Sequence, residues 1–285
     1  MNKNKIITHR GLEPSNPNFY SESSFEAFKN HLDRGFGIEF DPNFTKDGIV
    51  VVHDSNLARI TDNKNQRAIS DLTTQEALSV ELGNGRLCSL GELMELIKNS
   101  HSKINALHLK GKFQKPEYLD KLIAGLANYP DVLDRILIFD VTPETAKYLK
   151  SKNPNFHLAP SVSHPYDIQR YNQAVLGTLI SVEDAIKYRQ EGLFDWVWLD
   201  EWDRTDENGQ DKKLYTKEVF EKLKVAGYKI ALVTPEMHAF SPGLLGGEFH
   251  QDAKPKERLF ARIKQIISLK PNSICTDYPE ESLKL

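Results

Sequence analysis

Three short stretches near the start of the chain combine residue types that can move protons beside a metal ion and a phosphate. They read His9-Arg10-Gly11, Ile38-Glu39-Phe40-Asp41 and Val51-Val52-His53-Asp54, and each follows a run of apolar residues. Histidine titrates near neutral pH, so His9 and His53 are candidates for a general acid and a general base. Because apolar runs lead into these polar residues, we expect each stretch to mark the end of a strand.

The two carboxylates of the second stretch suggest a metal site. Glu39 and Asp41 are two residues apart, so on a strand their side chains point to the same side. Neighbouring carboxylates repel unless a cation lies between them, and a hard divalent ion such as Mg²⁺ or Ca²⁺ prefers oxygen ligands. The alternative is a salt bridge from one carboxylate to Lys110 or Arg10. Arg10 also offers a planar guanidinium suited to phosphate, and Lys110 offers a second positive charge.

The elements that would position these residues alternate between strand-like and helix-like segments. Eight apolar runs qualify as strands, at residues 5–9, 37–41, 104–110, 135–140, 155–160, 195–200, 228–234 and 273–277. Eight strands alternating with helices predict an α/β fold, a (β/α)8 TIM barrel, with a doubly wound sheet as the alternative. In such a barrel the carboxyl ends of the strands form the active face, where these polar residues would meet.

Helix start signals stand between the apolar runs. Ser23 with Glu26, and Ser89 with Glu92, have the spacing of a capping box. Further helices are expected to begin after Thr142, Ser181 and Thr216.

One segment interrupts the alternation. The turn signal at residues 45–48 is followed by the apolar run 49–53, which predicts a hairpin after the second strand. We interpret residues 42–88 as a small inserted subdomain at the barrel mouth, within a single domain that spans residues 1–285.

Composition narrows the class of protein. The chain has 285 residues, 27% of them charged, and a formal net charge of −3, which is ordinary for a globular domain and gives no basic face for nucleic acid. The two cysteines, Cys88 and Cys275, lack the spacing of a metal site. The first residues lack the apolar region of a signal peptide, and no apolar run is long enough for a membrane span. We expect a cytoplasmic protein with a small-molecule substrate.

The order and spacing of the motifs resemble the glycerophosphodiester phosphodiesterases. The resemblance covers residues 5–62 and returns briefly at Thr276-Asp277-Tyr278-Pro279. It rests on His9-Arg10-Gly11, the helix start from Glu22 to Phe28, Glu39-Phe40-Asp41, Asp47-Gly48 and His53-Asp54, followed by Leu57, Arg59 and Thr61. The resemblance implies a (β/α)8 barrel with an insertion after the second strand. It also implies an enzyme that hydrolyses a glycerophosphodiester-like substrate to a phosphomonoester and an alcohol.

The resemblance also implies roles for individual residues. His9 and His53 would be the acid/base pair and Arg10 would bind the phosphate, with Lys110 nearby. Glu39 and Asp41 would be ligands of a divalent metal, Mg²⁺, Ca²⁺ or Mn²⁺.

The third metal ligand departs from the family pattern. The family has a glutamate in a Glu-x-Lys motif on the next barrel strand, and here the motif reads His108-Leu109-Lys110. Three outcomes follow: His108 is the third ligand, Asp200 or Glu201 replaces it, or the metal is lost and the protein only binds its ligand. We name His108 as the ligand, and because histidine favours Mn²⁺, Fe²⁺ or Zn²⁺ over Ca²⁺, the metal preference should change accordingly.

The sixth strand ends in an unusually acidic stretch, Trp198-Leu199-Asp200-Glu201-Trp202-Asp203. Carboxylates hydrogen-bond sugar hydroxyls, and tryptophans stack on sugar rings or quaternary ammonium groups. Our hypothesis is that Asp200 and Glu201 bind a polyhydroxy or cationic leaving group, such as a sugar or an amino alcohol. The alternative is a solvated loop.

Three rival functions use the same fold. A phosphodiester lyase would stop at a cyclic phosphate, and a non-catalytic protein would bind a phosphate ester without turnover. A sugar-phosphate isomerase or aldolase lacks support, because Lys110 alone is placed for a Schiff base.

Overall fold

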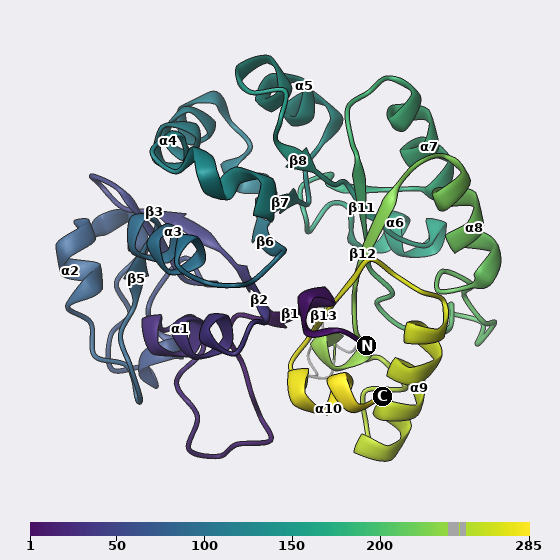
Figure 1. The fold of residues 1–285 in the computed structure, drawn as a ribbon, viewed down its shortest axis with the longest axis horizontal. Coiled ribbons are helices and arrows are strands. Elements are labelled where there is room, and N and C mark those ends of the chain that lie inside the picture. Colours follow the sequence, from purple (N-terminus) through teal and green to yellow (C-terminus); the bar gives the residue numbers. More distant parts are fainter. Residues whose placement is uncertain (239–244, 246–248) are drawn as a thin grey trace.

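Parallel strands form one curled sheet with helices on its outside (Figure 1). The computed structural model describes residues 1–238, 245 and 249–285. The sheet has the strand order β10-β9-β11-β12-β13-β1-β2-β6-β7-β8. Its strands are β1 (Ile6–His9), β2 (Gly37–Phe40), β6 (Asn105–His108), β7 (Ile136–Phe139), β8 (His157–Leu158), β9 (Ser161–Val162), β10 (Leu179–Ile180), β11 (Trp196–Leu199), β12 (Lys229–Val233) and β13 (Ser273–Thr276).

The fifth strand of the barrel is split into two short strands, β8 and β9, which together join the two sides of the sheet. β8 pairs with β7, whereas β9, three residues further on, pairs with β11. Between them the backbone N–H of Ala159 donates to Ile138, and the carbonyl of Pro160 accepts from Trp198. Pro160 has no N–H to donate, which accounts for the interruption. Because one stretch joins both edges, the predicted TIM barrel is confirmed, with β8 and β9 together as the strand expected at residues 155–160.

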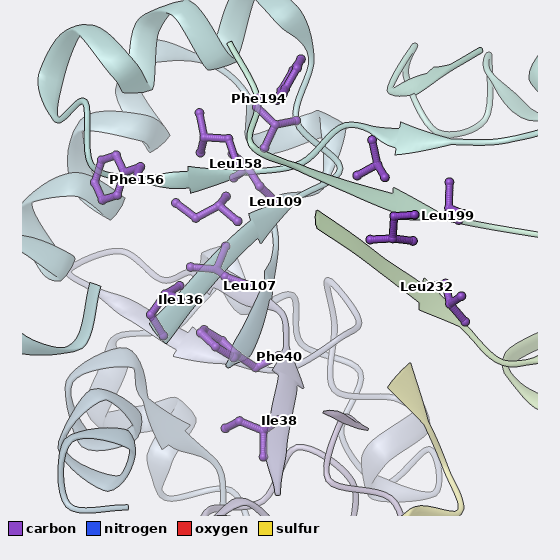
Figure 2. Packing of buried hydrophobic residues seen from close by; sticks show 14 of the residues in the cluster. Ile38, Phe40, Leu107, Leu109, Ile136, Phe156, Leu158, Phe194, Leu199 and Leu232 are labelled. Carbon is purple, nitrogen blue, oxygen red and sulfur yellow. The ribbon is translucent and has the colours of Figure 1, made fainter. Parts of the chain in front are cut away.

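Alternate residues of the barrel strands face inward and outward. Ile7, Ala106, Leu137, Trp198 and Ala231 belong to a core inside the barrel. Their neighbours along the strands pack against the helices, and Figure 2 shows several of these outward side chains. They include Ile38, Phe40, Leu107, Leu109, Ile136, Leu158, Leu199 and Leu232. This alternation decides which polar residues reach the barrel mouth.

Except for α2, which packs against the residues that follow β2, the described helices surround the sheet (Figure 1). They are α1 (Phe25–Asp33), α2 (Thr74–Leu78), α3 (Leu90–Lys98), α4 (Pro116–Ala127), α5 (Pro143–Lys152), α6 (Pro165–Tyr171), α7 (Val182–Gln190), α8 (Lys217–Val225), α9 (Lys256–Ser268) and α10 (Pro279–Lys284). Short 3₁₀ turns occur at Lys3–Lys5, Arg59–Thr61, Ile69–Asp71, Gly111–Phe113, Pro130–Arg135 and Pro235–His238.

The predicted helix starts hold with one exception. Ser89 and Glu92 form the expected capping box, and Thr142, Ser181 and Thr216 are N-caps. At α1, however, the N-cap is Ser24, whose side chain accepts from the N–H of Ala27. The predicted capping box of Ser23 with Glu26 is therefore wrong, because the Glu26 carboxylate accepts from the N–H of Arg86 instead.

The residues after β2 form a second, antiparallel sheet. The predicted hairpin is present as β3 (Pro42–Phe44) and β4 (Ile49–Val51), and β5 (Cys88–Ser89) adds a third strand that the sequence did not indicate. A small apolar cluster lies under this sheet. The description of residues 42–88 as one inserted subdomain stays a prediction.

Cys88 and Cys275 are both free and buried. None of the helices in the described parts of the chain has the length and apolar character needed to cross a bilayer.

Candidate active site

Two adjoining cavities lie at the carboxyl ends of the barrel strands. The first, of about 230 Å³, is lined by His9, Arg10, Glu39, His108, Phe139, Asp140, Ser161, Val175, Leu179, Trp198, Asp200, Trp202, Val233, Met237 and His238. The second, of about 300 Å³, is lined by His53, His108, Lys110, Gly111, Lys112, Asp140, Ala174, Val175 and Leu176. His108 and Asp140 line both, so the cavities meet at these two residues.

Glu39, Asp41 and His108 form a cluster with the composition of a metal site. One potential ligand atom from each lies within 4.8 Å of the others. Both carboxylates are buried, and Asp41 Oδ2 has no hydrogen-bond partner among the described residues. A buried carboxylate oxygen without a partner is unfavourable unless a cation or a donor reaches it. The donor set therefore fits a divalent cation.

The charges of the two carboxylates in this cluster support the same conclusion. Burial, together with the charge of Asp41, raises the pKa of Glu39 to about 8. Burial alone would also raise the pKa of Asp41, but Lys110 and His108 hold it well below its ordinary value. The Lys110 ammonium lies 3.2 Å from Asp41 Oδ1. The protein thus compensates one of the two carboxylates, and a bound cation would relieve the repulsion on the other.

The imidazole of His108 is held between two carboxylates. Its Nδ1 lies 2.9 Å from Asp41 Oδ1, and its Nε2 lies 3.3 Å from Asp140 Oδ2. The ring also stacks on Phe139, with 4.7 Å between centroids. Burial by itself would lower the pKa of His108, but the hydrogen bonds that Asp140 and Asp41 accept from its ring raise it to about 9.

His9, at the end of β1, pairs with a carboxylate from the other end of the chain. Its Nδ1 lies 2.9 Å from Oδ1 of Asp277, which directly follows β13. Burial lowers the pKa of His9 well below its ordinary value and raises the pKa of Asp277 to about 7. Glu236 supports Asp277 from below by accepting its backbone N–H at 3.0 Å. Burial therefore favours a neutral His9, the form that can accept a proton.

His53 is positioned by a chain of ion pairs. Its Nδ1 lies 2.6 Å from Asp54 Oδ1, and Arg59 donates to the other Asp54 oxygen at 2.6 Å. Arg59 also binds both carboxylate oxygens of Glu22, at 2.6 and 2.8 Å. Burial lowers the pKa of His53 to about 4, so this histidine is also neutral at pH 7.

Two cations lie beside the metal cluster. Arg10 Nε is 3.7 Å from Asp41 Oδ2, and Nη1 is 4.0 Å from a Glu22 oxygen. Its backbone has φ of 52°, and its N–H donates to Glu39. Lys110 donates to the carbonyl of His53. Arg10 and Lys110 therefore both contact the Asp41 carboxylate of the cluster. Arg10 also follows His9 in the chain, and Lys110 also contacts the backbone of His53.

The acidic stretch after β11 divides between two environments. Asp200 lines the first cavity, and its Oδ1 lies 2.6 Å from Nε2 of His238. Burial alone would lower the pKa of His238, but Asp200 raises it. Trp202 stacks on the His238 ring, with 4.7 Å between centroids.

Glu201 does not line either cavity. It is buried against α9, where Arg262 Nη2 lies 2.6 Å from its Oε1, and it also accepts the N–H of Tyr215. Adjacent residues leaving a strand point to opposite sides, which separates Glu201 from Asp200.

The structure brings together most of the predicted site residues. His9, Arg10, Glu39, His108 and Asp200 line the first cavity, His53 and Lys110 line the second, and Asp41 lies buried beneath them. The partners that sequence reasoning left without a role are Asp277, Asp140, Asp54, Arg59, Glu22 and His238. Asp140 and Asp277 follow barrel strands directly, a position that marks them as polar residues of the active face without indicating which histidine each contacts.

Comparisons with known proteins agree with this geometry. The sequence profile of the glycerophosphoryl diester phosphodiesterase family matches residues 9–171. A search of curated proteins found no match. Among solved structures, the fold resembles a Galdieria sulphuraria protein assigned as a glycerophosphodiester phosphodiesterase, with a TM-score of 0.69, 19% identity, and coverage of 98% of this chain and 96% of that one.

Two further structures show the same fold. A glycerophosphodiester phosphodiesterase from Agrobacterium tumefaciens has a TM-score of 0.62 and 18% identity, with 98% of each chain covered. A phosphodiesterase from Oleispira antarctica, solved with the product sn-glycerol-3-phosphate, has a TM-score of 0.62 and 16% identity, with 98% of this chain and 95% of that chain covered.

The profile match extends over more than half of the chain and contains both predicted histidines and all three predicted metal ligands. The chain belongs to the glycerophosphoryl diester phosphodiesterase family. The predicted class of enzyme, a phosphoric diester hydrolase of this type, is therefore confirmed.

Proposed function

We propose that this protein hydrolyses a glycerophosphodiester-like small molecule to a phosphomonoester and an alcohol, with His9 and His53 as the acid/base pair. The observation that carries the proposal is that two carboxylate-paired histidines line adjoining cavities that meet at a potential metal site. Phosphodiester hydrolysis needs one group to deprotonate the nucleophile and one to protonate the leaving alkoxide.

Glu39, Asp41 and His108 would hold the divalent cation. When bound, such an ion supplies positive charge to the non-bridging oxygens of the phosphate. The protein contributes two further charges, because the Arg10 and Lys110 side chains both lie beside the Asp41 carboxylate. Arg10 is suited to bind two phosphate oxygens through its planar guanidinium.

The two histidines are held so that one nitrogen of each remains for the substrate. Nδ1 of His9 faces Asp277 and Nδ1 of His53 faces Asp54. Each carboxylate fixes the ring orientation and stabilises the imidazolium that forms when the histidine takes up a proton. Water, or a neighbouring hydroxyl of the substrate, would be the nucleophile.

The leaving group is the part of the substrate that we assign to the Asp200 side of the first cavity. The Asp200 carboxylate can accept hydrogen bonds from a polyhydroxy alcohol or attract a cationic one, and Trp198 lines the same cavity, whereas the Trp202 ring already stacks on Tyr171 and His238. Glu201 does not take this role, because its carboxylate is paired with Arg262. Asp200→Asn should raise KM for such diesters several-fold; unchanged kinetics on every diester tested would remove this assignment.

A ³¹P NMR time course tests the proposed reaction. The purified protein is incubated with glycerophosphodiesters that carry different alcohols, in turn with Mg²⁺, Mn²⁺, Ca²⁺ and Zn²⁺. We expect the diester resonance to be replaced by that of a phosphomonoester. A cyclic phosphate that persists would instead identify a lyase, and binding without turnover under every condition would identify a phosphate-ester binding protein.

A further inference from the structure

We propose that Asp140 is a positioning residue for the metal site, because its carboxylate holds the His108 ring so that Nδ1 faces Asp41 within the cluster of Glu39, Asp41 and His108. The inference rests on the proposed function, since it concerns the third ligand of the proposed metal. It adds a requirement that is specific to this chain. Because residue 108 is a histidine, the ring nitrogen that does not bind the metal needs a hydrogen-bond acceptor.

The His108 ring is restrained from three directions. Asp41 Oδ1 lies 2.9 Å from Nδ1, and Asp140 Oδ2 lies 3.3 Å from Nε2. The Phe139 ring lies almost parallel to the imidazole, at an angle of 11°. A histidine that binds a metal through one nitrogen commonly donates the N–H of the other to a carboxylate, which fixes its tautomer. Asp140 occupies the position of that carboxylate.

The backbone at Asp140 is shaped for this contact. Asp140 has φ of 65°, in the left-handed region, which is unfavourable for most residues other than glycine. Gln114 stabilises the turn by donating to the Asp140 carbonyl at 2.6 Å and by accepting the N–H of Thr142 at 2.9 Å. The turn places a buried carboxylate at the boundary of the two cavities, next to His108.

The pairing predicts that residues 108 and 140 are matched to each other. A glutamate at position 108 would bring a third ligand carboxylate close to the Asp140 carboxylate, and two such charges repel. The Asp140 carboxylate should therefore favour metal binding when residue 108 is histidine and oppose it when residue 108 is glutamate.

A double-mutant cycle on metal affinity tests this coupling. Isothermal titration calorimetry with Mn²⁺ and Zn²⁺ compares the metal-free wild-type protein, Asp140→Asn, His108→Glu and the double variant. We expect Asp140→Asn to weaken binding about ten-fold in the wild-type background and to leave it unchanged or strengthen it in the His108→Glu background. Asp195→Asn is the matched control, because Asp195 pairs with His157 just before β11, at the opposite end of that strand from Asp200.

The outcomes separate the inference from the proposed function. If the wild-type protein binds none of these ions, the proposed metal site and the inference both fail. If the wild-type protein binds metal and Asp140→Asn weakens binding equally in both backgrounds, or in neither, only the inference fails.

A second measurement uses the wild-type protein and does not depend on the variants folding. Histidine ¹⁵N NMR of the Zn²⁺-loaded protein reports which nitrogen of His108 carries a proton. We expect Nε2 to be protonated and Nδ1 to be bound to the metal. The opposite tautomer, or a ring with both nitrogens protonated in the presence of Zn²⁺, would overturn the role assigned to Asp140.

Discussion

The imidazole of His9 and the carboxylate of Asp277 lie 2.9 Å apart, from Nδ1 to Oδ1, although 268 residues separate them in the sequence. They stand at the ends of β1 and β13, the first and last strands of the barrel, which pair in parallel. The pairing of these two strands therefore also brings His9 and Asp277 together. Since Nδ1 is engaged with Asp277, Nε2 is the nitrogen of His9 that remains for the substrate.

Asp277→Asn should lower kcat about 10²-fold with little change in KM, because an amide stabilises neither the correct tautomer of His9 nor its imidazolium. Steady-state kinetics on the best diester substrate measures this. Asp195→Asn removes an aspartate of the other end of the barrel that also pairs with a histidine, and should retain activity. A loss shared by both variants would point to general destabilisation rather than to the His9–Asp277 pair.

Arg59→Met should lower kcat roughly ten-fold, because Arg59 joins Glu22 to Asp54 and so fixes the carboxylate that orients His53. Arg67→Met is the comparison, since Arg67 is similarly exposed and pairs with exposed Glu76 rather than with a carboxylate that contacts His9 or His53. Steady-state kinetics compares kcat of the two variants. Equal values would mean that the Glu22–Arg59–Asp54 chain does not position His53.

Glu39→Gln should abolish metal binding and yet stabilise the metal-free protein. The pKa of Glu39 is raised from 4.5 to about 8, so between these values the folded protein retains a proton that the unfolded chain releases. Stability is therefore lost as the pH rises through this window. In EDTA at pH 8, urea unfolding should show Glu39→Gln more stable than wild type by about 1 kcal/mol or more. A less stable variant would contradict the strain assigned to this carboxylate.

His31 should make the fold sensitive to acid. It is fully buried, its ring faces the carbonyl of Gly11 at 3.2 Å, and burial lowers its pKa from 6.5 to about 3. The unfolded chain therefore takes up a proton below pH 6.5 that the folded protein resists, so stability falls as the pH falls from 6.5 towards 3. The contribution between pH 7 and pH 5 is about 2 kcal/mol.

Urea unfolding at pH 7 and pH 5 compares His31→Gln with His101→Gln, a substitution of an exposed histidine. The difference in stability between the two pH values should shrink in His31→Gln and remain in His101→Gln. Equal pH dependence in both variants would place the acid sensitivity elsewhere.

The barrel could be predicted because its signals are local. Apolar runs ending in polar residues marked all eight strands, and alternation along a strand placed Glu39 and Asp41 on one side. The predicted N-cap of α1 was wrong by one residue because Ser24 can cap the same helix. The Glu26 carboxylate instead accepts from the N–H of Arg86, which lies in a distant segment.

The partners of the site residues could not be predicted, because they depend on contacts between segments far apart in the sequence. Asp277 reaches His9 through strand pairing, and His238 reaches Asp200 across two neighbouring strands. Glu201 is instructive, since its adjacency to Asp200 already implied that one of the two would face away from the cavity.

The central claim is that His9 and His53 form the acid/base pair of a phosphodiesterase. Its most direct test is kcat of His9→Ala and of His53→Ala on the diester that the wild-type protein hydrolyses fastest, with His101→Ala as the control. Loss of a positioned acid or base lowers rates by about 10²- to 10⁴-fold. We therefore expect kcat of each of the two variants to be at least about 10²-fold lower than that of the wild type, while the control keeps its activity. If either His9→Ala or His53→Ala retains activity close to that of the wild type, that histidine is not a member of the pair.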